Sequence, residues 1–149
     1  MVCLYGMRSY IEAEAPADVT APLVKRKINS ILLIYPALCI PDDALNLFPT
    51  VADIPEEYDM MNMKIGRAYY EPVLNYDIYR DIMRYRGDVL ILHGTEDSLV
   101  KPEYSALASN FYKNCELHLL VGAGHGFRTP EMAGFYHFYV QNFLARHLK

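Results

Sequence analysis

Two short apolar runs constrain the fold of this chain more than any other feature. The first run, residues 89–92 (VLIL), leads into a polar turn that contains Asp97. The second run, residues 117–121 (LHLLV), leads into a glycine-rich loop that contains His125. An unbroken apolar run such as residues 89–92 is typical of a strand buried on both faces of a parallel sheet, and residues 117–121 are predicted to be another strand of that sheet. Because the carboxyl ends of parallel strands share one edge of a sheet, the pattern predicts an Asp–His pair at that edge.

The remaining pattern predicts an alternating α/β arrangement. Another apolar run, residues 31–34, is stopped by Pro36 and indicates a further buried strand. Helices are expected over residues 78–83, from Pro102, and from Pro130, where proline suits the first helical position. The resulting order is strand, insertion, helix, strand, helix, strand, helix, which favours a parallel sheet with helices on its faces.

Two helices carry apolar stripes, and the N-terminal region carries no strand signal. The helix from Pro102 is expected to face inward through Leu107 and Phe111, with Ala108 as a further candidate. The C-terminal helix, with Thr129 as its N-cap, is expected to pack through a longer stripe. That stripe consists of Met132, Phe135, Tyr136, Tyr139 and Phe143. Before residue 28 the sequence predicts at most a short helix near residues 10–13, followed by a proline-interrupted loop.

Residues 41–86 differ in character from the rest of the chain. Prolines interrupt this segment, methionines cluster at residues 60–63, and tyrosines recur through it. It is too long for a simple connection in a compact domain, so it is predicted to be an inserted subdomain or lid. Its methionines and tyrosines have two interpretations. They line an adaptable binding surface, or they fill a small irregular core.

Length and composition predict one soluble domain that spans residues 1–149. The chain has 52% hydrophobic residues, 21% charged residues and a net charge of −4. This balance argues against a nucleic-acid partner, because non-specific binding needs a concentrated basic face. The N-terminus lacks a signal-peptide pattern, and no apolar run approaches membrane-spanning length. We therefore expect a cytoplasmic protein without a membrane partner.

The cysteine and histidine spacings do not predict a metal site or any other cofactor. Cys3, Cys39 and Cys115 are odd in number and widely spaced, and there is no C-x-x-C pair. The sequence also lacks H-E-x-x-H, the spacing of a zinc protease site. We expect no disulfide framework and a reducing compartment.

His125 and Asp97 are the candidate catalytic residues. A histidine near its ordinary pKa can take a proton from a nucleophile and return it to a leaving group, while a carboxylate on the other ring nitrogen fixes the tautomer. Glu96 is a rival to Asp97 but would point elsewhere in the turn. His93, at a strand end, is expected to form local hydrogen bonds. The remaining histidines are expected on a strand or on the terminal helix; they are His118, His137 and His147.

Residues 31–149 resemble the C-terminal half of an α/β-hydrolase, and within that superfamily the cinnamoyl and feruloyl esterases. The resemblance rests on residues 32–43 (LLIYPALCIPDD), 89–97 (VLILHGTED) and 116–127 (ELHLLVGAGHGF). It implies a three-layer partial α/β-hydrolase fold that acts on a small carboxylic ester, including hydroxycinnamoyl esters. By this likeness Asp97 and His125 are the acid and the base of a serine-hydrolase triad, and the insertion is a lid over an aromatic acyl pocket.

The nucleophile of that family is missing from its usual place. The family carries it in a G-x-S-x-G elbow before the strand that corresponds to residues 31–34, and this sequence has no such motif. The nearest trace is residues 1–6 (MVCLYG), with Cys3 where the serine would stand. We therefore expect an N-terminally truncated hydrolase that is inactive without a missing N-terminal half. The alternative is a non-catalytic, degenerate hydrolase that serves as a binding or self-assembly module. In both cases an exposed sheet edge favours a homo-oligomer.

Overall fold

The computed structural model describes residues 2–5, 28–60 and 62–147, with only the backbone described for residues 2–5. The chain divides into two compact units. The first contains Met1–Ala37 and Tyr79–Lys149, and the second contains Leu38–Ile78. The predicted insertion, residues 41–86, overlaps the second unit, and its role as a lid stays a prediction. The predicted helix near residues 10–13 lies outside the described residues.

The first unit is built on a four-stranded sheet. Its strands are β1 (Val2–Tyr5), β2 (Ser30–Ile34), β5 (Asp88–Gly94) and β6 (Asn114–Leu120), in the spatial order β1-β2-β5-β6. All neighbouring strands run parallel, so the predicted parallel sheet and its three predicted strands are confirmed. The expectation that no strand precedes residue 28 was wrong. Residues 2–5 are too few to show a pattern of their own, and their strand is defined by pairing with β2.

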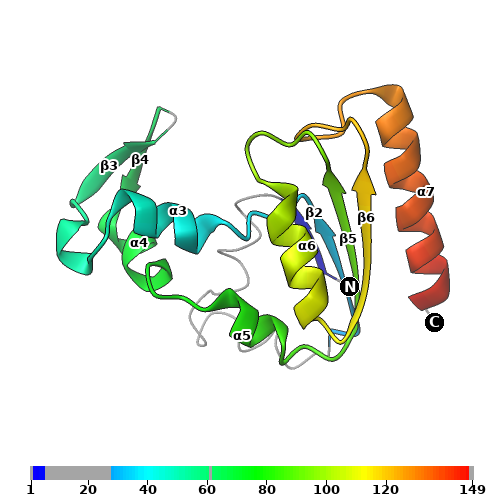
Figure 1. Cartoon of the computed structure of the whole chain (residues 1–149), viewed down its shortest axis with the longest axis horizontal. Coiled ribbons are helices and arrows are strands. Elements are labelled where there is room, and N and C mark those ends of the chain that lie inside the picture. Colours follow the sequence, from blue (N-terminus) through cyan, green and yellow to red (C-terminus); the bar gives the residue numbers. More distant parts are fainter. Residues whose placement is uncertain (1, 6–27, 61, 148–149) are drawn as a thin grey trace. The chain divides into compact units, whose positions relative to one another are not determined.

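Two helices cover opposite faces of this sheet (Figure 1). Helix α7 (Pro130–His147) places Phe143 in the main core. Successive residues of a strand point to opposite faces of the sheet, so alternate strand residues join this core. That core also holds Leu32, Ile34, Leu90, Leu92, Leu120, Ala123 and Phe127. On the other face, helix α6 (Pro102–Phe111) buries Ser105 and Ala108 and contacts β5 and β6. None of the helices among the described residues is long and apolar enough to cross a membrane.

The helices form where they were predicted, but parts of their apolar stripes face solvent. Leu107 is 46% exposed and Phe111 37% exposed, because α6 turns its small residues toward the strands. On α7, Phe135 is 45% exposed, whereas the rest of the predicted stripe packs on the core. Thr129 Oγ1 accepts a hydrogen bond from the Met132 amide at 3.2 Å, which confirms the predicted N-cap. A short helix, α5 (Ile78–Ile82), precedes β5 and lies within the predicted range.

The second unit has a small core of its own. It contains α3 (Ile40–Leu47), a 3₁₀ turn (Val51–Asp53), a hairpin of β3 (Glu57–Met60) and β4 (Met63–Gly66), and α4 (Arg67–Val73). Phe48, Tyr58 and Tyr70 meet in edge-to-face contacts with ring centroids 5.0 to 6.1 Å apart. The Tyr70 hydroxyl lies 3.6 Å from the sulfur of Met60. These aromatic and sulfur contacts favour, for these residues, the interpretation as a small irregular core.

Candidate active site

The predicted Asp–His pair is formed at the carboxyl edge of the sheet. Asp97 lies in the loop after β5, and His125 lies in the loop after β6. Nδ1 of His125 and Oδ2 of Asp97 are 2.8 Å apart. The carboxylate is fully buried, whereas the imidazole side chain keeps 27% of its surface exposed. Because Asp97 engages Nδ1, Nε2 is the ring nitrogen that can exchange a proton with a reacting group.

Backbone hydrogen bonds tie the two loops together. The Thr95 amide donates to the Leu120 carbonyl at 3.0 Å, and the Glu96 amide donates to the Ala123 carbonyl at 2.9 Å. In return, the Gly122 amide donates to Thr95 Oγ1 at 3.0 Å. The β5–β6 ladder therefore extends past the strand ends and sets the separation between the acid and the histidine before any substrate binds.

Glycines allow this close approach at two places. A Cβ on Gly94 would lie 2.6 Å from the carbonyl carbon of Ala123, and still closer to its oxygen, so the loops meet where only glycine fits. Gly126, directly after His125, has a φ of +99°, which side chains on L-residues rarely adopt. Gly124 needs neither property, so of the two glycines that flank the histidine, only Gly126 is required by the turn.

The Asp97 carboxylate accepts hydrogen bonds on both oxygens. Its Oδ1 accepts from the backbone amides of Leu99 and Val100, each at 2.9 Å. Its Oδ2 contacts His125 at 2.8 Å and His93 Nε2 at 3.3 Å. Burial raises the pKa of this carboxyl, but the hydrogen bonds from Val100, His125 and Leu99 outweigh it and hold the pKa below its ordinary value. Asp97 is therefore ionised and oriented at neutral pH.

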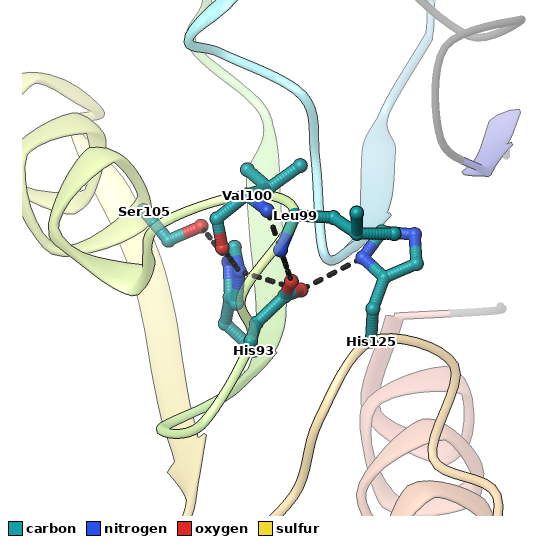
Figure 2. Close-up of polar contacts among 6 residues, drawn as sticks. His93, Leu99, Val100, Ser105 and His125 are labelled. Carbon is teal, nitrogen blue, oxygen red and sulfur yellow. Dashed lines mark hydrogen bonds and ion pairs between the residues drawn. The ribbon is translucent and has the colours of Figure 1, made fainter. Parts of the chain in front are cut away.

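His93 forms the local hydrogen bonds that the sequence predicted, and it also reaches the site. Figure 2 shows its ring between Ser105 and the Val100 carbonyl. Nδ1 lies 2.6 Å from Ser105 Oγ, and Nε2 lies 3.0 Å from the Val100 oxygen. Burial lowers the pKa of His93, and this effect outweighs the hydrogen bond to Val100 and the charge of Asp97, which both raise it. The imidazole is therefore neutral.

Two aromatic residues with left-handed backbones support the exposed histidine. The ring of Tyr35 lies against that of His125, with centroids 4.4 Å apart, and meets Phe127 edge-on at 5.3 Å. Tyr35 has a φ of +38° and Phe127 a φ of +45°. Such conformations cost on the order of 1–2 kcal/mol each and are concentrated at functional sites. No role was predicted for Tyr35 from the sequence, where the available signal is an aromatic residue at the carboxyl end of a strand, followed by Pro36.

The pKa shift of His93 predicts a loss of stability in mild acid. Below the ordinary His pKa of 6.5, the unfolded chain takes up a proton that the folded chain, with its lowered pKa, does not. The free energy of unfolding should therefore fall as the pH falls below this value, by at most about 1.4 kcal/mol per pH unit for this group. Asp97, whose lowered pKa has the same sign, adds a further loss only at more acidic pH.

Urea denaturation at a series of pH values between 8 and 5 measures this effect. His93→Gln keeps a hydrogen-bond donor but does not titrate, so its stability should vary less with pH in this window than that of the wild type. A wild type and variant with parallel pH profiles would show that His93 does not carry the proton linkage.

The other predicted residues lie apart from this pair. Glu96 is exposed beside Asp97, and His118 lies on β6. His137 and His147 lie on α7. Backbone pairing aligns Cys3 with Leu32, two positions before Tyr5, the last residue of β1. A residue in an elbow would instead follow a strand, so this backbone position does not match an elbow. The Cys3 side chain lies outside what the structure describes, and its role as a nucleophile stays a prediction.

The two other cysteines do not have the properties of an activated thiol. Cys39 is buried at the start of α3, and burial together with the nearby Asp43 raises its pKa to about 12. Burial, and then the charge of Glu116, raises the pKa of Cys115 to about 11. A reactive thiol needs a lowered pKa, so both side chains stay protonated at neutral pH.

Comparison with solved structures decides the fold. No family model matches the sequence, and no curated protein matches it. Est1E from Butyrivibrio proteoclasticus is similar, with a TM-score of 0.75 and 25% identity over 86% of this chain and 55% of that protein. This is a partial α/β-hydrolase fold. The resemblance inferred from the sequence is thereby confirmed, as is the predicted fold class; the lid stays a prediction.

Two further structures support the α/β-hydrolase fold. Est1E with ferulic acid bound matches with a TM-score of 0.73 and 24% identity, over 86% of this chain and 53% of Est1E. Mouse alpha/beta hydrolase domain-containing protein 10 matches with a TM-score of 0.66 and 11% identity, over 86% of this chain and 56% of that protein. The chain thus spans about half the length of these α/β hydrolases. The structural neighbours are esterases and other hydrolases.

Proposed function

We propose that this chain contributes the acid and the base of a carboxylic-ester hydrolase. The observation that carries the proposal is the 2.8 Å hydrogen bond between a half-exposed histidine and a buried, ionised aspartate. Asp97 keeps the proton on Nδ1 of His125, so Nε2 can remove a proton from a nucleophile and later deliver it to the leaving alcohol. As His125 becomes an imidazolium, the Asp97 carboxylate stabilises its charge.

Hydroxycinnamoyl esters are the proposed substrate class. Est1E, which shares 25% identity with this chain, has been solved with ferulic acid, a hydroxycinnamic acid. In support, Tyr35 lies directly against His125, and an aromatic ring there suits a planar aromatic acyl group. The second compact unit, Leu38–Ile78, is proposed as the lid.

The nucleophile is proposed to come from a missing N-terminal half of the fold. The sequence has no G-x-S-x-G, and the solved relatives are about twice as long as the matched region. β1 is the strand at one edge of the sheet, and that edge is where further strands would pair. Under this proposal the isolated chain has little or no esterase activity, and the missing half supplies the nucleophile.

Reconstitution tests the proposal. The DNA upstream of Met1 is expected to encode an in-frame strand followed by G-x-S-x-G. That half, expressed separately and mixed with this chain, should hydrolyse methyl ferulate, whereas each half alone should not. A fluorophosphonate probe should label the added half only in the mixture, because the serine needs the histidine as its base.

One outcome would count against an esterase, and another would count against a nucleophile from a missing half. An upstream region without the motif, together with a chain that hydrolyses neither short acyl nor hydroxycinnamoyl esters, would favour the non-catalytic alternative. Labelling of this chain itself by the probe would show that the nucleophile lies within it. A Cys3→Ala variant would then show whether Cys3 is the modified residue.

A further inference from the structure

A row of buried polar side chains leads from α6 to the candidate active site. Ser105 Oγ lies 2.6 Å from Nδ1 of His93, and Nε2 of His93 lies 3.3 Å from Oδ2 of Asp97. Ser105 and His93 are both 0% exposed, and the Asp97 side chain is fully buried. The dashed lines in Figure 2 trace this row from Ser105 and continue to His125. Asp97 therefore has two histidine partners, one buried and one exposed.

The hydrogen-bond partners fix the direction of every proton in the row. Nε2 of His93 faces the Val100 carbonyl and the Asp97 carboxylate, which can only accept, so Nε2 carries the proton. A neutral imidazole has one donor and one acceptor nitrogen, so Nδ1 accepts from the Ser105 hydroxyl. In the opposite tautomer, a lone pair on Nε2 would face two acceptor oxygens and repel the carboxylate.

We propose that Ser105 and His93 act as a tautomer lock. In this role they orient Asp97 toward His125. They also keep His93 neutral, so that of the two histidines that contact Asp97, His125 is the one that takes up a proton. His93 and Ser105 are positioning residues, since they act on the reacting histidine through Asp97. The inference rests on the proposed function in that Asp97 and His125 are the catalytic pair.

Burial indicates that Ser105 and His93 do more than fill space in the interior. Burying an imidazole and a hydroxyl costs free energy, which only hydrogen bonds to their polar atoms can offset. Apolar side chains could fill the same space without that cost. Here both ring nitrogens of His93 are paired, and one of them contacts the catalytic carboxylate. The seclusion of His93 from water disfavours its charged form, while the imidazole of His125 is 27% exposed.

NMR on the full chain tests the lock directly. A long-range ¹H–¹⁵N spectrum distinguishes a protonated from an unprotonated ring nitrogen, and in the wild type at pH 7 it should show His93 neutral with its proton on Nε2. In Ser105→Ala the Nδ1 lone pair loses its donor, so the ¹⁵N signal of Nδ1 should move downfield toward that of an imidazole nitrogen without a hydrogen bond, while Nε2 keeps its proton. Hydrogen exchange of the Leu99 and Val100 amides, which bind Asp97 Oδ1, should accelerate by roughly 10-fold, about the effect of weakening one hydrogen bond.

Ser109→Ala is the matched control. Ser109 lies on the same helix and donates to the Ala106 carbonyl at 2.8 Å, so its loss should leave His93 and both amides unchanged. The lock is overturned if Ser105→Ala and Ser109→Ala give the same spectra, or if wild-type His93 carries its proton on Nδ1. If Ser105→Ala does not fold, the wild-type spectrum still decides, and Ser105→Cys, with a weaker donor, should move the Nδ1 signal partway. No turnover is needed, so a failed esterase assay leaves this test intact.

Discussion

Replacing His125 with alanine should abolish ester hydrolysis in the reconstituted enzyme. Among the described residues, His125 is the histidine that contacts the ionised Asp97 and also keeps part of its ring exposed. The variant therefore removes the base for the nucleophile. In a hydrolase whose triad acts as a unit, loss of the histidine alone lowers kcat by about 10⁶. The expected change in KM is small, because His125 acts on the reacting atoms more than on the bound ester. Steady-state kinetics on methyl ferulate measures both constants.

A matched histidine variant makes this result specific. His137 is exposed on α7, so His137→Ala should keep the wild-type kcat. His137→Ala should unfold at close to the wild-type urea concentration, whereas His125→Ala should still fold but lose about 1–3 kcal/mol, because the buried Asp97 carboxylate loses a hydrogen-bond donor. Hydrolysis that persists in His125→Ala would remove the Asp–His pair from the mechanism altogether.

The second large effect is expected from Gly94→Ala, a change of one methyl group. The added Cβ would overlap the backbone of Ala123, which cannot move without breaking the hydrogen bond from Glu96 to the same carbonyl. Overpacking of this kind costs about 1–3 kcal/mol, and a backbone obstacle places this site at the upper end. The variant should also separate the two loops, so the His125 Nδ1 proton signal that reports its bond to Asp97 should weaken or vanish.

Gly124→Ala provides the control for the glycine experiment. Gly124 lies next to His125, but a Cβ there would meet only the Glu96 carbonyl at an ordinary 3.7 Å. Its unfolding free energy should stay within about 0.5 kcal/mol of the wild type, as for a surface substitution without strain. Equal stability of the two alanine variants would show that the loops are not held at the separation seen here.

The central part of the fold and the Asp–His pair could be predicted because their signals are local. The runs at residues 31–34 and 89–92 are unbroken and largely buried, as strands covered on both faces require, whereas the run at residues 117–121 lies on an edge strand with Leu119 41% and Val121 82% exposed. The polar residues that follow two of these runs are then brought together by the parallel topology alone. A pattern of this kind does not depend on contacts that are distant in sequence.

The parts that could not be predicted depend on such distant contacts. β1 is a strand only because it pairs with β2, more than 20 residues later. Helix α6 turns Ser105 and Ala108 to the sheet, so the large residues that suggested an inward stripe lie on its outer side. The connection from Ser105 to Asp97 also crosses from a helix to a strand and a loop, and no spacing in the sequence indicates it.

The hydrogen bonds between the loops after β5 and β6 have a consequence for folding order. Asp97, His125, the strands that carry them and the helix between them all belong to one contiguous β-α-β segment, from Asp88 to Phe127. The Asp97–His125 contact spans 28 residues, whereas the β2–β5 pairing of Ser30 with Asp88 spans 58, so the Asp–His contact closes the shorter loop and is expected to form earlier than that pairing. The acid and the base are therefore expected to be in place before any other polypeptide docks. A second polypeptide that supplied the nucleophile would then bind a surface that has already folded, and would not be needed to form it.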